Sequence, residues 1–122
     1  MNLENTHALM AIYPALFSCI SHDEPFALFG FECGDGWFEI LKELIEGIKQ
    51  VCDREKIYVK VEQVKEKFGQ LRFYASGIRD DIRELIEIAE YKSGKTCEMC
   101  GKPAESKSER GWWFTLCDKC HK

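Results

Sequence analysis

The sequence has no long hydrophobic run and no basic cluster at its start. The apolar stretch at residues 8–20 covers thirteen positions and contains Pro14, whereas a membrane-spanning helix needs about 20 apolar residues. Residues 1–7 carry Glu4 and neither lysine nor arginine, unlike the positively charged start of a secretion signal. We therefore expect a cytoplasmic protein with no membrane role.

Histidine is scarce, and no histidine lies in a catalytic motif. Before the C-terminal segment there are only His7 and His22, both in sequence typical of a terminus or a loop. Acid–base catalysis needs a side chain placed beside the reacting group, and a nucleophile needs a neighbouring base. Cys33 and Asp35 have no histidine at a convincing spacing, which favours a packed thiol over a catalytic pair. The sequence predicts a protein that is not an enzyme.

Repeats, low-complexity tracts and long linkers are also missing. With 122 residues, 45% of them hydrophobic, the chain can form one compact core but not two large domains. The formal net charge of -4 disfavours sequence-independent attraction to nucleic acid, which would then need a local basic patch.

Cysteine, in contrast, is plentiful, with seven residues. Cys19, Cys33 and Cys52 occur singly in apolar or helical sequence, where a free cysteine behaves as a small hydrophobic residue. The odd number and these isolated positions indicate a reducing compartment such as the cytoplasm.

The other four cysteines form two Cys-x2-Cys pairs, Cys97 with Cys100 and Cys117 with Cys120, separated by sixteen residues. Each short pair can present two thiolates to one tetrahedral ion, so the spacing predicts a structural Zn²⁺ site. Gly101 suits the left-handed conformation that turns backbone N–H groups toward the sulfurs. Two disulfides, or free thiols that share this spacing by chance, are the alternatives.

The segment between the two pairs completes a predicted zinc ribbon at residues 95–122. Residues 104–110 and Gly111 are typical of a loop tip, and residues 112–116 of a strand. Four thiolates fill the tetrahedron, so His121 is left out of the ligand set and the zinc is expected to hold structure without catalysing. We expect the ribbon to dock on the preceding helix through Trp112, Trp113, Phe114 or Met99.

Helical periodicity dominates the sequence before the ribbon. Apolar side chains recur at helical spacing over residues 37–52 and 78–92, with charged side chains on the other sides, which predicts two amphipathic helices. A short helix, broken or restarted at Pro14, is predicted within residues 7–20. Residues 26–31 are rich in aromatic side chains and are compatible with either a strand or a buried loop.

The tripeptide Gly34-Asp35-Gly36 directly precedes the main predicted helix. Asp35 is placed to cap that helix, and the glycines permit a tight entry. The N-terminus of a helix can also bind phosphate. A capping carboxylate would occupy the same donors and repel the phosphate, so capping is favoured.

A change to a period of two at Ile57 predicts a β-hairpin over residues 57–75. Val64 breaks the alternation, which predicts a bulge near Gln63. Phe68 and Gly69 supply the turn.

The outward face of this hairpin is a candidate ligand surface. Basic and aromatic side chains interleaved on a sheet can stack on bases and neutralise phosphate. The same residue types are ordinary on a solvated hairpin face, and Glu62 and Glu66 dilute the positive charge. Both interpretations stay open at this point. The candidate residues are Tyr58, Lys60, Lys65, Lys67, Arg72 and Tyr74.

Three motifs in combination resemble a family of small uncharacterised proteins found in phages, prophages and bacteria. They are Cys33-Gly34-Asp35-Gly36-Trp37, the sequence VKEKFGQLRFY at residues 64–74, and the paired cysteines with Gly111-Trp112 between them. The likeness covers about residues 9–120. It implies a phage or mobile-element origin and a setting in the cytoplasm of a host bacterium, and it implies no particular activity.

The predicted fold is α+β, with two amphipathic helices and a β-hairpin around one core (residues 1–94) and a four-cysteine zinc ribbon (residues 95–122) docked on it as one structural domain. The predicted function is a non-enzymatic, phage-type binding protein that captures a host protein or an anionic nucleotide signal, with counter-defence as a candidate role. Nucleic-acid binding through the ribbon and the hairpin is the first alternative, and an enzyme of unknown reaction is the weakest. The sequence names neither the ligand nor the oligomeric state, and a homodimer is compatible with it.

Overall fold

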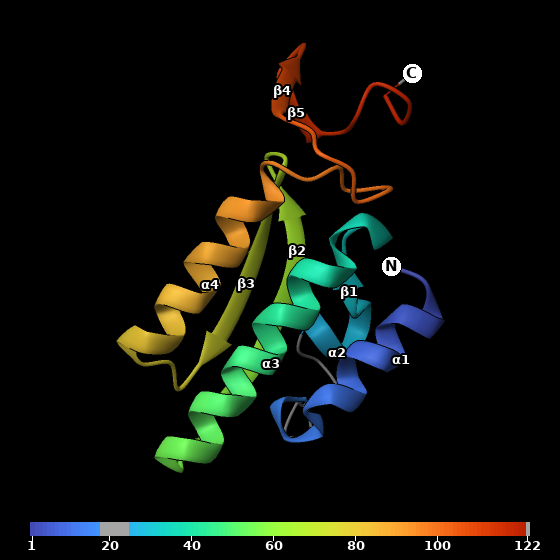
Figure 1. The fold of residues 1–122 in the computed structure, drawn as a ribbon. Helices are drawn as coiled ribbons and strands as arrows, with labels where there is room; N and C mark the ends of the chain where they lie inside the picture. Colours follow the sequence, from blue (N-terminus) through green and yellow to red (C-terminus); the bar gives the residue numbers. More distant parts are fainter. Residues whose placement is uncertain (18–24, 122) are drawn as a thin grey trace.

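The computed structural model describes residues 1–17 and 25–121 and shows a mixed α+β architecture (Figure 1). In the core, the helices are α1 (Leu3–Ile12), α2 (Pro25–Phe29), α3 (Phe38–Glu55) and α4 (Asp80–Ser93), and the strands are β1 (Phe31–Glu32), β2 (Lys60–Lys67) and β3 (Gln70–Ser76). Two 3₁₀ turns, Pro14–Leu16 and Asp35–Trp37, precede α2 and α3. The ribbon contains β4 (Ser106–Glu109) and β5 (Trp112–Thr115).

The core sheet has the strand order β1-β2-β3, with β1 parallel to β2 and β2 antiparallel to β3. The pairing register shifts between Val61 and Gln63, which confirms the predicted bulge. Because one residue is inserted there, Val61 and Val64 are both fully buried although they are three positions apart, a spacing that would place them on opposite faces of a regular strand. The bulge therefore keeps the apolar side of β2 on the core.

Helices α3 and α4 pack side by side against one face of the sheet (Figure 1). Their apolar stripes face inward, as the helical periodicity predicted. The buried side chains of α3 are Ile40, Leu41, Leu44, Ile45, Ile48, Val51 and Cys52.

Among the described residues, no helix has both the length and the apolar character needed to cross a membrane.

Side chains of α4 also complete the hydrogen bonding of β3, which is an edge strand. The Leu71 N–H donates to Ser93 Oγ at 2.8 Å, and the Phe73 N–H donates to a Glu90 carboxylate oxygen at 3.1 Å. These two donors have no strand partner, and a buried N–H without an acceptor is costly. The position of α4 is therefore set by polar contacts as well as by apolar packing.

The aromatic stretch at residues 26–31, predicted as a strand or a buried loop, divides between two elements. Most of it lies in α2, and its last residue begins β1. Phe26 and Phe31 are both buried, with ring centroids 5.0 Å apart in an edge-on arrangement. A helix within the stretch was not predicted, because the aromatic side chains mask a helical period over so few residues.

The first helix begins at Leu3, earlier than predicted, and ends at Ile12. Pro14 then starts a 3₁₀ turn, in agreement with the predicted interruption. The end of the predicted helix, with Cys19, lies outside the described residues, as does His22.

Candidate metal centre and ligand groove

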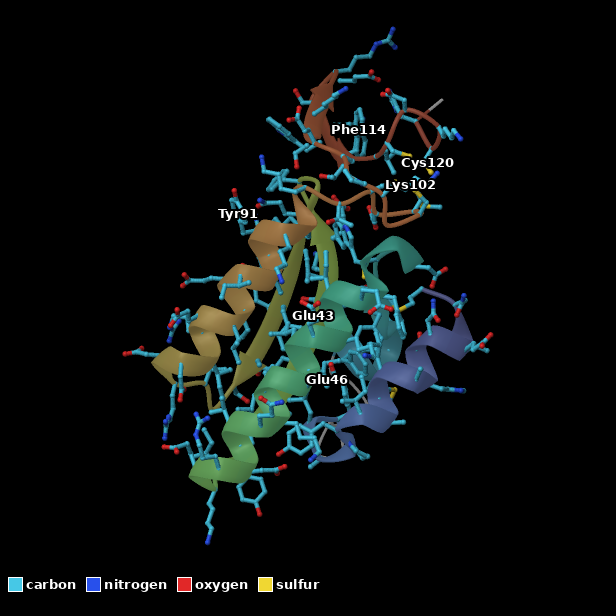
Figure 2. All side chains as sticks on the ribbon, in the orientation of Figure 1. Glu43, Glu46, Tyr91, Lys102, Phe114 and Cys120 are labelled. Atoms are coloured by element: carbon cyan, nitrogen blue, oxygen red, sulfur yellow. The ribbon has the colours of Figure 1, made fainter. Side chains whose placement is uncertain are left out.

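The structure brings the four predicted cysteine ligands together in the ribbon, where Figure 2 labels Cys120. Their sulfur atoms all lie within 4.8 Å of one another, and those of Cys100 and Cys117 are 3.5 Å apart. In a tetrahedral site with metal–sulfur distances of about 2.3 Å, the sulfurs are about 3.8 Å apart. All four are free thiols. The cluster therefore has the size and chemistry to hold a metal ion, and no disulfide occupies it.

Each cysteine pair is shaped by short backbone hydrogen bonds. The Cys97 N–H donates to the Lys102 carbonyl at 2.7 Å, and the Gly101 N–H donates to the Cys97 carbonyl at 3.0 Å. Gly101 has a φ of +82°, the left-handed conformation that was predicted for it. The Cys120 N–H closes the second turn on the Cys117 carbonyl at 3.1 Å. Both turns thus present their sulfurs to one point.

The thiols of the cluster differ in their readiness to ionise. Burial alone would raise the pKa of Cys97, but the backbone N–H groups of Cys117, Cys100 and Met99 point at its sulfur and lower this pKa to about 6. The hydrogen bond with the Cys117 thiol raises the pKa of Cys120 to about 12. A cation among them would favour the thiolate at every position, because metal binding displaces thiol protons.

The first cysteine turn docks on the loop that precedes α3. The Gly36 N–H donates to the Glu98 carbonyl at 2.7 Å, and the Gly34 N–H donates to the Glu98 carboxylate at 2.9 Å. A Cβ on Gly34 would lie 2.4 Å from the Glu98 carbonyl oxygen, and one on Gly36 would lie 2.1 Å from the carbonyl oxygen of Cys97. Only glycine permits this approach of two backbones.

The prediction that Asp35 caps the main helix is wrong. No side chain caps α3 or the 3₁₀ turn before it. Asp35 instead accepts hydrogen bonds from the Asn2 N–H at 2.9 Å and the Asn5 side-chain amide at 3.1 Å, and these bonds, chiefly that from Asn2, lower its pKa. The N–H groups of both flanking glycines go to Glu98, so they are also not free to bind phosphate.

The second docking contact joins the core hairpin turn to β5. The Thr115 hydroxyl donates to the Gly69 carbonyl at 2.5 Å and lies 2.7 Å from the Ser106 hydroxyl. The backbone of Thr115 also accepts a hydrogen bond from the Glu98 N–H at 2.9 Å. Thr115 is fully buried, and its hydrogen bonds to Gly69 and Glu98 link the two docking contacts.

The prediction that aromatic side chains or Met99 would dock the ribbon is wrong. Trp112, Trp113 and Met99 are exposed, and Phe114 stacks on His121 with ring centroids 4.4 Å apart. The ribbon docks instead through backbone groups and a buried hydroxyl. Part of the predicted loop tip, residues 104–110, forms β4 instead, because it pairs with β5.

Two hairpin turns form a groove of about 530 Å³ where the ribbon meets the core. In Figure 1 the ribbon lies beyond the turn that joins β2 to β3. The turn of the core hairpin and the turn of the ribbon supply opposite walls. The lining residues are Lys65, Glu66, Lys67, Phe68, Arg110, Gly111, Trp112 and Trp113.

The groove has more available positive charge than negative charge. The side chains of Lys65 and Arg110 make no hydrogen bond or ion pair within the described part of the chain. The Lys67 ammonium lies 5.5 Å from the centroid of the Phe68 ring, within reach of a cation–π contact. Glu66, the one carboxylate in the lining, accepts the Gly69 N–H at 2.8 Å.

Both turns place a large side chain in the left-handed region. Phe68 and Gly69 have φ values of 55° and 80°, and Arg110 and Gly111 have 52° and 85°. Hairpin turns with two positive φ values favour Asn-Gly or Gly-Gly, and a bulky residue at the first position costs about 1 kcal/mol. Strained residues concentrate at functional sites, so these two turn tips are candidates for a ligand-binding role.

The six predicted residues of the hairpin face do not form one small site. Lys65 and Lys67 lie in the groove, and Arg72, which donates to the Gln70 side chain at 3.2 Å, pairs with Lys65 across the strands. The other three lie farther along the hairpin. Tyr58, 86% exposed, precedes β2, Lys60 begins it, and Tyr74 pairs with Gln63. Lys67 lies seven positions after Lys60 along the strand, a distance of about 23 Å.

The sequence analysis did not find four of the groove residues. Phe68 was assigned only to a turn, Arg110 only to a loop tip, and Trp112 and Trp113 to docking. The sequence did contain a signal, because each of the two turns places a bulky residue directly before a glycine between two strands. A bulky residue in the left-handed conformation of such a turn is unusual.

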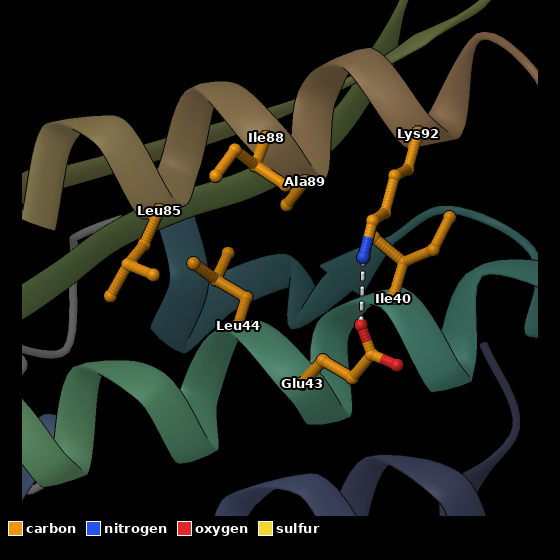
Figure 3. A pocket seen from close by; sticks show the side chains of 7 residues that line it. All are labelled: Ile40, Glu43, Leu44, Leu85, Ile88, Ala89 and Lys92. Atoms are coloured by element: carbon orange, nitrogen blue, oxygen red, sulfur yellow. Dashed lines mark hydrogen bonds and ion pairs between the residues drawn. The ribbon is translucent and has the colours of Figure 1, made fainter.

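A smaller pocket lies between α3 and α4 (Figure 3). Its lining is apolar apart from the ion pair of Lys92 with Glu43 at 3.0 Å, and its volume is about 120 Å³. Ligand sites usually occupy about 300–1,000 Å³, so this pocket is too small for a substrate. Cys33 is buried, and that burial raises its pKa to about 12, which makes it a poor nucleophile.

Comparisons with protein families, with curated proteins and with solved structures found no match. Function is therefore inferred from the metal centre and the groove themselves.

Proposed function

We propose that this chain is a zinc-stabilised, non-enzymatic protein that binds an anionic ligand of the nucleotide type in the groove between its two hairpin turns. The observation that carries the proposal is the convergence of three cationic side chains with three exposed aromatic ones from two distant parts of the sequence. Aromatic faces stack on bases, and lysine and arginine neutralise phosphate. Each turn contributes both kinds of side chain, so a ligand in the groove could contact cations and rings from both turns.

The metal in this proposal is Zn²⁺, held by Cys97, Cys100, Cys117 and Cys120. Four thiolates at tetrahedral spacing suit zinc, and they leave no open position for water or substrate. The ion would therefore stabilise the ribbon without taking part in catalysis.

The resemblance to phage- and prophage-associated proteins supports a setting in the cytoplasm of a bacterial host. There, sequestering a nucleotide signal would serve counter-defence. Capture of a host protein is the second form of the proposal, since the exposed ring of Trp112 is of the type that anchors protein interfaces.

Native mass spectrometry of the purified chain, with and without a panel of linear and cyclic nucleotides, tests the proposal. The wild type should carry about one zinc ion per chain and gain the mass of a nucleotide. A double variant, Lys65→Gln with Lys67→Gln, should lose the nucleotide and keep the zinc. The control is Tyr58→Ala, which removes a predicted residue outside the groove and should bind as the wild type does. No added mass with any nucleotide, or loss only in the control, would contradict the proposal.

A further inference from the structure

We infer that the groove binds a single strand of nucleic acid in preference to a free nucleotide, an inference that rests on the proposed function. The groove walls would leave much of a small ligand open to solvent, because Trp112 is 77% exposed, Phe68 62% and Trp113 48%. Sites for small molecules bury about 70–90% of the ligand surface. A polymer can instead contact several exposed side chains at once, and such linked contacts bind tightly together even when each is weak alone.

The basic and aromatic side chains also continue beyond the groove along one face of the hairpin. Lys65 and Lys67 are two residues apart on β2 and so lie on the same face, about 7 Å from each other. Arg72 pairs with Lys65, and Tyr74 follows two residues later on β3. A row of cations that ends in an exposed ring is suited to a phosphate backbone with its bases. A free nucleotide would reach only one end of this series.

Exposed rings at turn tips favour an unpaired strand over a duplex. The bases of a duplex stack on one another and offer no free face, whereas unpaired bases stack on aromatic side chains. Phe68 and Trp112 lie on opposite turns of the same groove, so each can meet a different base.

The net charge of -4 belongs to the whole chain, whereas the groove lining contains three cationic side chains and one carboxylate. Glu66 accepts the Gly69 N–H, and Glu109, next to Arg110, pairs with His121 at 3.0 Å. Other carboxylates, such as the labelled Glu43 and Glu46 on α3, lie away from the ribbon (Figure 2). The local basic patch that the sequence analysis required is thus present.

Fluorescence anisotropy with a labelled oligothymidylate of about 15 nucleotides and the full zinc-loaded chain tests the inference. Trp112→Ala should weaken binding by about 5- to 100-fold, the loss expected for one stacked base. If the wild type neutralises three phosphates, the logarithm of its binding constant should fall with the logarithm of the salt concentration with a slope of about -2. Arg110→Asn should make this slope shallower by about 0.7. Phe68→Asn should weaken binding while folding at least as stably, because asparagine suits the left-handed position. The matched control is Tyr91→Ala, an exposed ring on α4, which should not change the affinity.

The inference would be overturned by equal affinity for a duplex of the same length, by equal losses in Tyr91→Ala and Trp112→Ala, or by a free nucleotide that binds as tightly as the oligonucleotide. The last result would leave the proposed function standing. Absence of both nucleotide and oligonucleotide binding would reject both, and loss of a protein partner in Trp112→Ala without any nucleic-acid binding would also reject the inference.

Discussion

Replacing Gly36 by alanine should detach the first cysteine turn from the core. The new Cβ would lie 2.1 Å from the Cys97 carbonyl oxygen and 2.6 Å from the Glu98 carbonyl carbon. Both are backbone atoms, so no flexible side chain can move aside. The loop must therefore shift, and the hydrogen bonds from Gly34 and Gly36 to Glu98 break.

The cost can be worked from those contacts. Two lost hydrogen bonds amount to about 2 kcal/mol, and a partly buried carboxylate left without its donor adds about 1 kcal/mol. Burial raises the pKa of Glu98, and the hydrogen bond from the Gly34 N–H is the main effect that opposes this rise. We expect the free energy of unfolding to fall by about 3 kcal/mol, with a drop in Tm of roughly 10 °C.

Urea denaturation of the zinc-loaded chain measures this change, and Gly30→Ala provides the matched control. Gly30 has a φ of +62° and no neighbouring atom within 4 Å of an added Cβ, so alanine there costs only backbone strain, about 1 kcal/mol. A chelator should also remove zinc faster from Gly36→Ala than from Gly30→Ala. Equal urea midpoints for the two variants, or a Gly36→Ala chain as stable as the wild type, would show that the first cysteine turn is not held to the core by this close contact.

Three further predictions concern the metal and two polar contacts. Chelation should release about one zinc per chain and disorder the ribbon, seen as loss of near-UV circular dichroism from its tryptophans; an unchanged spectrum would show that the ribbon does not need the ion. Thr115→Val should destabilise the chain by about 1–2 kcal/mol in urea, because it leaves the Gly69 carbonyl without its donor, whereas Thr115→Ser should lose less; equal losses would assign the effect to packing. The depressed pKa of Asp35 means that its carboxylate stabilises the fold at neutral pH and that this contribution is lost as the pH falls below about 4. Asp35→Asn should therefore lower Tm at pH 7, and the difference from the wild type should shrink steadily as the pH falls below about 4; a difference that does not shrink at acid pH would argue against the linkage.

Periodic local patterns were sufficient to predict most elements of the fold. The stripes of α3 and α4 follow the helical period over many residues, and the alternation in β2 even located its bulge. The four cysteines were predicted as one cluster because their spacing reflects a local turn geometry. Each of these signals lies within one short stretch of sequence.

Contacts between distant residues were predicted poorly, because they leave no periodic trace. Asp35 had the local surroundings of a helix cap, yet its partners are at the start of α1 and the neighbouring N–H groups bind Glu98. The aromatic run at residues 112–114 had the apolar character of a docking surface. The docking instead uses Thr115, whose single buried hydroxyl has no distinguishing sequence signal.

The groove could not be predicted for a related reason. Each of its two turns was recognisable in the sequence, but their opposition depends on how the ribbon sits on the core. Lys65 and Lys67 were named as ligand candidates without the residues that face them. The orientation of the ribbon therefore decides whether those lysines belong to a solvated strand or to a site.

Three sequence motifs, at residues 33–37, at residues 64–74 and at the paired cysteines, meet at this docking interface, which connects the candidate metal centre to the groove. Bridging Cys97 to Cys117 with one ion would hold Glu98 beside β5, where its N–H donates to the Thr115 carbonyl. The Thr115 hydroxyl in turn donates to Gly69, in the turn whose tip is Phe68. Two hydrogen-bonded residues, Glu98 and Thr115, thus connect the cysteine cluster to the turn that lines the groove. An ion held by the four cysteines would therefore help to fix the position of the ribbon turn relative to the core turn, even without an open coordination position.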